Sequence, residues 1–281
     1  DLIMNISKQT VAIVREVWKK NPPQDWQVTY LPHGVNENHF KPLKSNDSVL
    51  LEMKRQLTND EIDFLVFYNN RNIRRKNPGD VILAFKTFCD MLPKEKAEKC
   101  GLLMHTQPRD ENGTDLPVVA NVIAGDYKVY FSDKKLSPER LNALYNMADV
   151  TINMASNEGF GLGTCESLMA GTPIIVNVTG GLQDQCGFKL KGKHLTENDY
   201  RDNIHSLHDD KKWADNPDLT CGEWVKPIWP RTRSLQGSPP TPYIFDDRCR
   251  WDEAGDALRY WYDKGPEGRE EAGKKGIEFV K

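Results

Sequence analysis

Short apolar runs alternate with amphipathic stretches along most of the chain. The run FLVFY at 64–68 shows no polar alternation, as expected for a strand buried on both faces of a parallel sheet. Between such runs, apolar residues recur at helical spacing, as in the segment that Pro78 begins. This alternation predicts an α/β fold with a parallel sheet and helices on both faces. The expected strands are residues 28–31, 64–68, 102–105, 129–131, 150–154 and 173–178; the expected helices are 3–20, 78–88, 137–148, 165–170, 252–263 and 267–280.

Residues 209–242 break this rhythm. They contain three tryptophans and six prolines, including the run GSPPTP. Tryptophan side chains need burial, so the segment favours a long ordered loop over a disordered linker. We expect an insertion of unknown role, followed by two closing helices.

Composition narrows the class of protein. Hydrophobic residues make up 38% of the 281 residues, too many for a chain that is disordered throughout. The formal net charge of −3 argues against general coating of nucleic acids. We see no apolar run of membrane-span length and no signal peptide. The six cysteines form no CxxC pair, which indicates reduced thiols in a cytoplasmic protein and not a zinc ribbon or a disulfide scaffold.

The stretch from 155 to 171 carries the most specific chemistry. Three glycines in Gly159–Gly163 separate an expected strand from the next helix, so the backbone can approach a ligand closely. A helix N-terminus there offers unpaired N–H groups and a positive dipole end, which bind anions. Glu158 and Glu166 flank the turn, and a carboxylate can accept two hydrogen bonds from a vicinal diol. The pattern predicts a ligand that carries phosphate and a ribose or sugar ring.

Simpler interpretations stay open at this point. The dinucleotide fingerprint of hydride-transfer enzymes is G-x-G-x-x-G, and this turn is G-x-G-x-G, a weak match. The turn can also be purely structural, with Glu158 on the surface and Glu166 as a helix cap. The basic run RNIRRK at 71–76 can likewise be a solvated turn.

Four segments, in order and spacing, resemble the retaining glycosyltransferases of the GT-B fold, family four. The first is EGFGLGTCE at 158–166, in which seven residues separate two glutamates. The others are LPHGVN at 31–36, like the family's P-(H/N)-G-V-D segment with Asn36 for Asp; NNRNIRRKNP at 69–78, like its G-R-x4-K-G clamp with Asn70 and Asn77 for the glycines; and TGGLQD at 179–184, like its G-G-x-x-E turn with Asp184 for Glu. The resemblance covers about residues 27–190 and implies a Rossmann-like domain, the C-terminal half of a GT-B fold.

The resemblance also implies an activity: transfer of a sugar from a nucleoside-diphosphate sugar to an unknown acceptor, with retention at the anomeric carbon. Arg71 and Lys76 would hold the diphosphate and stabilise the leaving group, which suits a bidentate guanidinium and a point-charge ammonium. Glu158 would bind hydroxyls of the donor sugar, and we count it with the two cations as catalytic. Glu166 would bind the ribose hydroxyls.

The remaining donor contacts implied by the resemblance come mainly from the backbone. Gly34 would let the chain approach the donor, and the base would lie near the strand at 129–131 and the residues after it. No Asp-x-Asp manganese motif is present, so we expect neither a metal nor a cofactor beyond the donor. The expected binding residues are Gly34, Arg71, Lys76, Tyr130, Phe131, Leu136, Glu158, Gly159, Phe160, Gly161, Leu162 and Glu166.

Structural roles are expected for other polar residues near these motifs. Thr164 suits a helix cap, and His33 and His105 suit hydrogen bonds within their loops better than base catalysis. Asp246 and Asp247, after the Pro-rich segment, suit a cap or a loop hydrogen bond.

The resemblance divides the chain into three parts. Residues 1–26 correspond to a helix and linker from a preceding acceptor domain, 27–248 to the donor-binding domain with its insertion, and 249–281 to the closing helices. A GT-B enzyme has two such domains, so we expect an N-terminal acceptor domain in the full-length protein. The partners would be a nucleotide-sugar donor and a glycan, lipid or protein acceptor.

Three alternatives remain. The chain can be a non-catalytic module that binds nucleotide sugars without an acceptor domain, and transfer to any acceptor would separate this function from a transferase. A GT-B-like sugar epimerase fits the glutamate pair and the HGV segment less well. A nucleic-acid binder using RNIRRK lacks interleaved aromatic residues.

Overall fold

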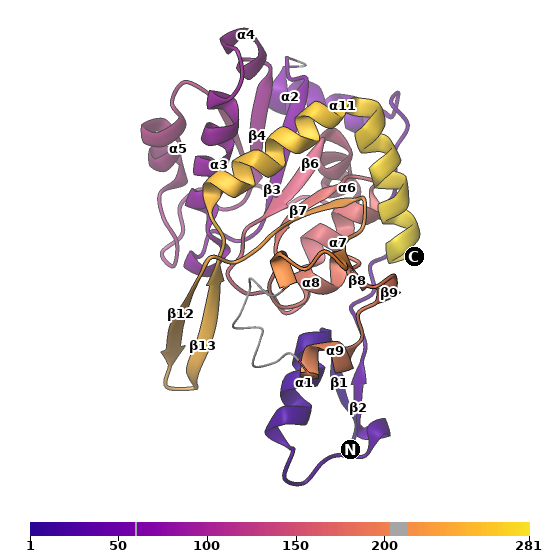
Figure 1. Cartoon of the computed structure of the whole chain (residues 1–281). Helices are drawn as coiled ribbons and strands as arrows, with labels where there is room; N and C mark the ends of the chain where they lie inside the picture. Colours follow the sequence, from indigo (N-terminus) through magenta and orange to yellow (C-terminus); the bar gives the residue numbers. More distant parts are fainter. Residues whose placement is uncertain (60, 203–212) are drawn as a thin grey trace.

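A six-stranded parallel sheet with helices on both faces forms the body of the protein in the computed structural model (Figure 1). The structure describes residues 1–59, 61–202 and 213–281. The strand order is β11-β7-β6-β3-β4-β5, which confirms the predicted α/β class. The strands are β3 (Phe64–Asn69), β4 (Cys100–His105), β5 (Lys128–Ser132), β6 (Val150–Asn153), β7 (Ile174–Asn177) and β11 (Val225–Ile228).

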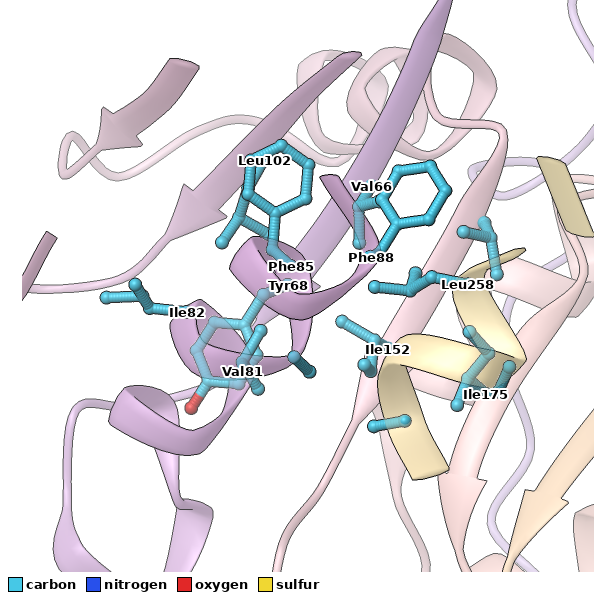
Figure 2. Close-up of a cluster of buried hydrophobic side chains, with 14 of the residues drawn as sticks. Val66, Tyr68, Val81, Ile82, Phe85, Phe88, Leu102, Ile152, Ile175 and Leu258 are labelled. Carbon is cyan, nitrogen blue, oxygen red and sulfur yellow. The ribbon is translucent and has the colours of Figure 1, made fainter. Parts of the chain in front are cut away.

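Two apolar layers hold the helices onto the sheet. Successive side chains of β3 point to opposite faces, so Val66 and Tyr68 enter one layer and Leu65 and Phe67 the other. Figure 2 shows the first layer, in which Phe85 and Leu258 from two helices meet the sheet. The helices of this layer are α3 (Pro78–Asp90), α5 (Leu116–Ala124) and α11 (Trp251–Val280); the other layer has α2 (Ser48–Thr58), α6 (Pro138–Met147) and α7 (Leu162–Met169).

The N-terminal segment lies outside the six-stranded sheet, below the main body in Figure 1. The helix predicted over 3–20 is wrong at its start: residues Ile3–Asn5 form β1, which pairs in parallel with β2 (Val28–Tyr30). Helix α1 (Lys8–Val17) begins only after Ser7, whose side chain accepts a hydrogen bond from the Thr10 N–H. The helical spacing of the early isoleucines was therefore overridden by strand pairing and by this cap.

The predicted loop over 209–242 is corrected by the structure from residue 213 onward; residues 209–212 lie outside the described residues. Strand β11 extends the main sheet beside β7, and β12 and β13 form a hairpin that projects from the body (Figure 1). Trp213, Trp224 and Trp229 pack partly buried against a third apolar cluster, which confirms the need for burial that their side chains indicated.

The two closing helices are confirmed as the two halves of α11. They meet at Gly265, whose φ of 72° breaks the helical backbone ahead of Pro266. The second half packs closely against α7 and the turn after it: a Cβ on Gly273 would lie 1.9 Å from the Gly171 carbonyl oxygen. The remaining short elements are η1 (Asp25–Gln27), η2 (Arg74–Lys76), α4 (Lys94–Ala97), α8 (Leu182–Gln185), β8 (Lys189–Leu190), β9 (Lys193–His194), α9 (Glu197–Asp202), β10 (Leu219–Thr220), β12 (Thr232–Ser238) and β13 (Thr241–Arg248).

Candidate functional site

A cavity of about 430 Å³ opens at the carboxyl end of β3, beside the N-terminus of α7. Ligands of open α/β sheets bind at this edge, because the loops that follow the strands meet there. The cavity brings together six predicted site residues from two separate stretches of the sequence: Lys76, Glu158, Phe160, Gly161, Leu162 and Glu166. Its full lining is Ile6, His33, Asn69, Asn70, Lys76, Leu141, Glu158, Phe160, Gly161, Leu162, Gly163 and Glu166.

Lys76 and Glu158 form an ion pair at the floor of the cavity. The Lys76 ammonium contacts Glu158 Oε1, and both side chains are about nine-tenths buried. Asn153 Nδ2 donates to the same oxygen at 3.3 Å, and an Arg75 nitrogen lies 3.6 Å from Oε2. Burial lowers the pKa of Lys76, while Glu158 acts in the opposite direction. The pair thus presents a cation and a carboxylate, each with a defined position, to any ligand that enters.

The N-terminus of α7 forms one wall of the cavity. Gly161 precedes the helix with a φ of 89°, and a Cβ there would lie 2.5 Å from Leu182 Cδ2, so only glycine fits. Thr164 Oγ1 donates to the Gly161 carbonyl oxygen at 2.9 Å, a local structural role like the one predicted for it. Within the described residues no side chain caps α7 at Gly161, so the first N–H groups of the helix can bind an anion, with the helix dipole behind them.

The two glycines of the TGG turn, Gly180 and Gly181, lie directly against the loop that carries Glu158. A Cβ on Gly180 would lie 1.9 Å from the Glu158 carbonyl oxygen, and one on Gly181 would lie 2.4 Å from the Gly159 carbonyl oxygen. The Gly181 N–H donates to the Glu158 carbonyl oxygen at 2.9 Å. The TGG turn thus acts as a support for the candidate site, with no side chain of its own in the cavity.

Asn77 explains one departure from the motif of the resemblance. Its φ is 49°, in the left-handed region that favours glycine and tolerates asparagine. Its Nδ2 also donates to the Met154 carbonyl oxygen at 2.8 Å, which ties the basic turn to the loop after β6. Asparagine at this position keeps the backbone shape that a glycine would give.

Tyr145 is a site residue that sequence reasoning missed. Its hydroxyl donates to Glu166 Oε2 at 2.7 Å and accepts from Asn69 Nδ2 at 2.7 Å. Burial raises the pKa of Glu166, and the hydrogen bond from Tyr145 lowers it. Tyr145 lies on the inward stripe of α6, where a core role is the ordinary expectation, so no local pattern indicated a polar partner for its hydroxyl.

Other predicted site residues lie outside this cavity. Arg71 pairs with Asp110 at 2.9 Å and faces a neighbouring groove of about 1070 Å³ that the β12–β13 hairpin borders. Tyr130 and Leu136 pack against the second apolar cluster and Phe131 against the first. Their contact with a base stays a prediction, as does that of Gly34.

Gly159, within the glutamate motif, and His33, outside it, also line or support the cavity. Gly159 lies behind its wall, where a Cβ would meet Ile6 Cδ1 at 3.1 Å, so the N-terminal segment reaches the cavity. His33 packs edge-to-face on Phe160 with ring centroids 5.3 Å apart. His105 Nδ1 lies 3.0 Å from Ser132 Oγ, a hydrogen bond of the kind predicted for it.

Asp184, from the TGGLQD segment, holds the N-terminal segment in place. Its Oδ2 accepts from the Lys8 N–H at 3.0 Å and its Oδ1 from the Tyr200 hydroxyl at 3.3 Å, and the Tyr30 hydroxyl also donates to it. Burial raises the pKa of Asp184 to about 6. The residue that replaces the motif's glutamate is therefore committed to structure.

This shift gives a pH-dependent stability. A carboxyl whose folded pKa lies above its unfolded value binds a proton more tightly in the folded state, so its deprotonation destabilises the fold. We expect the unfolding free energy of the wild type, minus that of Asp184→Asn, to fall by about 3 kcal/mol as pH rises from 3 to 7, through the folded pKa of about 6. Urea titrations at several pH values measure this difference, and a flat difference would contradict the buried, raised carboxyl.

Three general features complete the description. In residues 1–59, 61–202 and 213–281 no group of three or more His, Cys, Asp or Glu side chains is placed to hold a metal ion. Within that same part of the chain, no helix combines the length and apolar character needed to cross a bilayer. Asp246 and Asp247 lie on strand β13 and not in the expected loop, and they accept hydrogen bonds from Asn157 and Thr179, which follow β6 and β7.

A parallel α/β sheet with a glycine-rich turn and two carboxylates at its carboxyl edge is typical of α/β domains that bind a ligand at this edge. Residues 51–216 match the family described as glycosyl transferases group 1, and the chain belongs to this family. It is 28% identical to the alpha-monoglucosyldiacylglycerol synthase of Acholeplasma laidlawii over 182 residues, which are 59% of this chain and 40% of that protein.

Solved structures share the fold at low sequence identity. Sucrose-phosphate synthase of Thermosynechococcus elongatus is 19% identical, with a TM-score of 0.62 over 100% of this chain and 53% of its own. HepE of Anabaena, in complex with UDP and glucose, is 14% identical, with a TM-score of 0.52 over 75% of this chain and 54% of its own. The domain is that of GT-B glycosyltransferases, and the chain spans about half the length of these relatives or less.

Proposed function

We propose that the chain is the donor-binding half of a retaining glycosyltransferase, which transfers a sugar from a nucleoside-diphosphate sugar. The observation that carries this proposal is the cavity in which Lys76, Glu158, Glu166 and the N-terminus of α7 converge. A cation and free N–H groups suit a diphosphate, and two separate carboxylates suit two sets of hydroxyls, ribose and sugar.

The roles follow from position. Lys76 and the N–H groups of Gly161 and Leu162 bind the diphosphate; Glu166 accepts hydrogen bonds from the ribose and Glu158 from the donor sugar. Arg71 joins the diphosphate once it leaves Asp110, because its guanidinium is exposed and its ion pair lies at the surface. Tyr130, Phe131 and Leu136 border the base, and Gly34 lets the backbone approach the donor.

The chemistry is the stabilisation of a leaving group. As the bond between the anomeric carbon and the phosphate oxygen breaks, negative charge grows on the nucleoside diphosphate, and preorganised cations and helix N–H groups stabilise it. No metal is needed for this step in the proposal. Retention is proposed through departure and attack on the same face of an oxocarbenium-like sugar.

A further domain is part of the proposal. Strands β1 and β2 form a parallel pair, an arrangement that is ordinarily found inside larger sheets covered on both faces. Large apolar side chains of this segment are exposed, among them Met4 at 61%, Val17 at 70% and Trp26 at 60%. We propose that an N-terminal acceptor domain covers them in the full-length protein.

A non-catalytic binding module is the second candidate. Lys76, Glu158 and Glu166 meet in a cavity formed by this chain alone, and binding without transfer needs no acceptor site. Such a module would bind the nucleotide sugar, protect it and release it unchanged. Product analysis with the full-length protein, UDP-glucose and candidate acceptors separates the two functions.

Calorimetric titration with UDP, GDP and ADP, each with and without magnesium, tests the site. We expect one nucleotide to bind equally well in both buffers, with UDP tested first because HepE was solved with UDP. Glu166→Ala should weaken that binding at least tenfold, since a hydrogen bond to a charged group contributes about 1.5–3 kcal/mol. Lys128→Ala, a surface ion-pair residue, is the control.

Two results would overturn the proposal. If the folded full-length protein binds none of the three nucleotides, the cavity is not a nucleotide site, although the fold is that of the family. Equal affinity of the wild type and Glu166→Ala would place the nucleotide elsewhere.

A further inference from the structure

Three polar side chains form a hydrogen-bonded line at the wall of the donor cavity, and one of them, Tyr145, is fully buried while the other two are half-buried. Asn69 Nδ2 donates to the Tyr145 hydroxyl at 2.7 Å, and that hydroxyl donates to Glu166 Oε2 at 2.7 Å. Asn69 and Glu166 line the cavity, whereas Tyr145 is fully buried behind them. Its ring is held edge-to-face by Phe67, with centroids 5.1 Å apart, and by Phe40 at 6.1 Å. The hydroxyl therefore has a position that the surrounding core determines.

The direction of these hydrogen bonds follows from proton counting. A phenol carries one hydrogen, and an ionised carboxylate carries none, so the bond between Tyr145 and Glu166 needs the phenol hydrogen. The Asn69 amide nitrogen donates a hydrogen bond to the phenol oxygen, so the phenol hydrogen itself is donated to the Glu166 carboxylate. One oxygen of Glu166 is thus committed to the protein, and in the part of the chain that the structure describes, Oε1 has no hydrogen-bond donor.

The backbone leaves room for this arrangement at one glycine. A Cβ on Gly163, one turn before Glu166 on α7, would lie 3.2 Å from the Tyr145 hydroxyl and 3.2 Å from the Asn69 carbonyl oxygen. Such contacts are tighter than ordinary van der Waals packing and would push the hydroxyl away from the carboxylate. Glycine at residue 163 therefore leaves the space that the hydrogen bonds among Asn69, Tyr145 and Glu166 need, in addition to its place in the EGFGLG turn.

We propose that Tyr145 is a positioning residue for nucleotide recognition: it fixes Oε2 of Glu166, so that Oε1 alone faces the cavity as the acceptor for a ribose hydroxyl. This rests on the proposed function, in which Glu166 binds the ribose. Burial raises the pKa of Glu166, and the Tyr145 hydroxyl opposes that rise, so the same contact favours the ionised form of the acceptor.

Tyr145→Phe tests this directly, because the ring and its packing stay while the hydroxyl is lost. We expect the Kd of UDP to rise five- to tenfold at pH 7. The ratio of the Kd of 2′-deoxy-UDP to that of UDP should fall toward 1, because the carboxylate no longer holds a hydroxyl. The pH below which UDP affinity falls should also move to a higher value. A purely structural role would change neither the ratio of the Kd values nor this pH.

The other titratable groups around Glu166 are His33, Lys76 and Glu158, which line the same cavity, and Cys165, its neighbour on α7. These groups are unchanged in Tyr145→Phe, so their contributions to the pH dependence cancel when the variant is compared with the wild type. Tyr127→Phe is the matched control: the Tyr127 hydroxyl donates to Asp90 at 2.6 Å at the opposite edge of the sheet. It should leave the affinity, the ratio and the pH dependence unchanged.

Asn69→Asp gives a second route if Tyr145→Phe does not fold. A carboxylate at residue 69 accepts where the amide donated, so it draws the single phenol hydrogen away from Glu166. Its charge affects both nucleotides alike, and the deoxy-to-ribo ratio should again fall toward 1. Suppose that the wild type binds UDP and that Glu166→Ala weakens this binding. If Tyr145→Phe and Asn69→Asp then keep the wild-type ratio of Kd values and the wild-type pH dependence, the positioning role is wrong while the proposed function stands. If wild type binds no nucleotide, the proposed function itself fails.

Discussion

Lys76→Ala should raise the Kd of UDP about a hundredfold, the largest effect on binding expected from a single side chain. The ammonium is nearly buried and directed at the cavity by Glu158, so its charge acts on a diphosphate with little screening by solvent. Truncating one partner of a buried charge pair costs about 2–5 kcal/mol, and a hundredfold loss lies within that range. Calorimetry with UDP at fixed ionic strength measures it.

The same substitution also destabilises the fold, and a double variant separates the two effects. Without Lys76 the buried Glu158 carboxylate loses its closest cation, which costs about 3 kcal/mol of unfolding free energy. Lys76→Ala combined with Glu158→Gln removes the unpaired charge, so we expect stability to recover while UDP binding stays weak. If binding recovers with stability, Lys76 is a structural residue and does not contact the diphosphate.

Gly180→Ala should give the largest loss of stability, more than about 3 kcal/mol, together with loss of nucleotide binding. The methyl group would lie 1.9 Å from the Glu158 carbonyl oxygen, a backbone atom that cannot move alone. The loop that carries Glu158 must therefore shift, and the cavity shifts with it. Urea unfolding and UDP titration on the same preparation measure both consequences.

Gly192→Ala is the control for backbone strain. Its φ of 81° is also in the left-handed region, but no atom lies within 4 Å of the added methyl group. We expect a cost of about 1 kcal/mol from the dihedral angle alone, with UDP binding unchanged. Similar losses in both variants would show that strain, and not the contact with the Glu158 loop, determines the effect of Gly180→Ala.

The central strands and several helix starts could be predicted because their signals are local. The FLVFY run of β3 is buried on both faces, and Ser137 caps α6 through the Arg140 N–H, as the Ser-Pro-Glu pattern indicates. Strand β11 could not be predicted in the same way. It is four residues long and contains Pro227, and only pairing with β7 makes it a strand.

The candidate site was predictable where a backbone conformation demands a residue type. The glycine turn at 159–163 and the two glutamates beside it converge on one cavity with Lys76. Tyr145 was not predictable, because a tyrosine on the inward face of a helix has the same pattern whether its hydroxyl is idle or bound. The hydrogen-bond partners of Asp184 could not be predicted either. Lys8 and Tyr200 come from elements whose packing against the TGGLQD segment no local pattern indicates.

The packing of α11 against α7 has a consequence for synthesis. Every residue of the donor cavity has left the ribosome once residue 166 is free, yet the surface that supports α7 comes from the other end of the chain, where Gly273 meets the Gly171 carbonyl oxygen and Gly276 lies against Leu168. A chain that ends at residue 250 holds every residue that lines the cavity and none of this support. We therefore expect such a chain, still attached to the ribosome, to bind UDP more weakly than one in which α11 has formed, and retention on a UDP resin measures the difference.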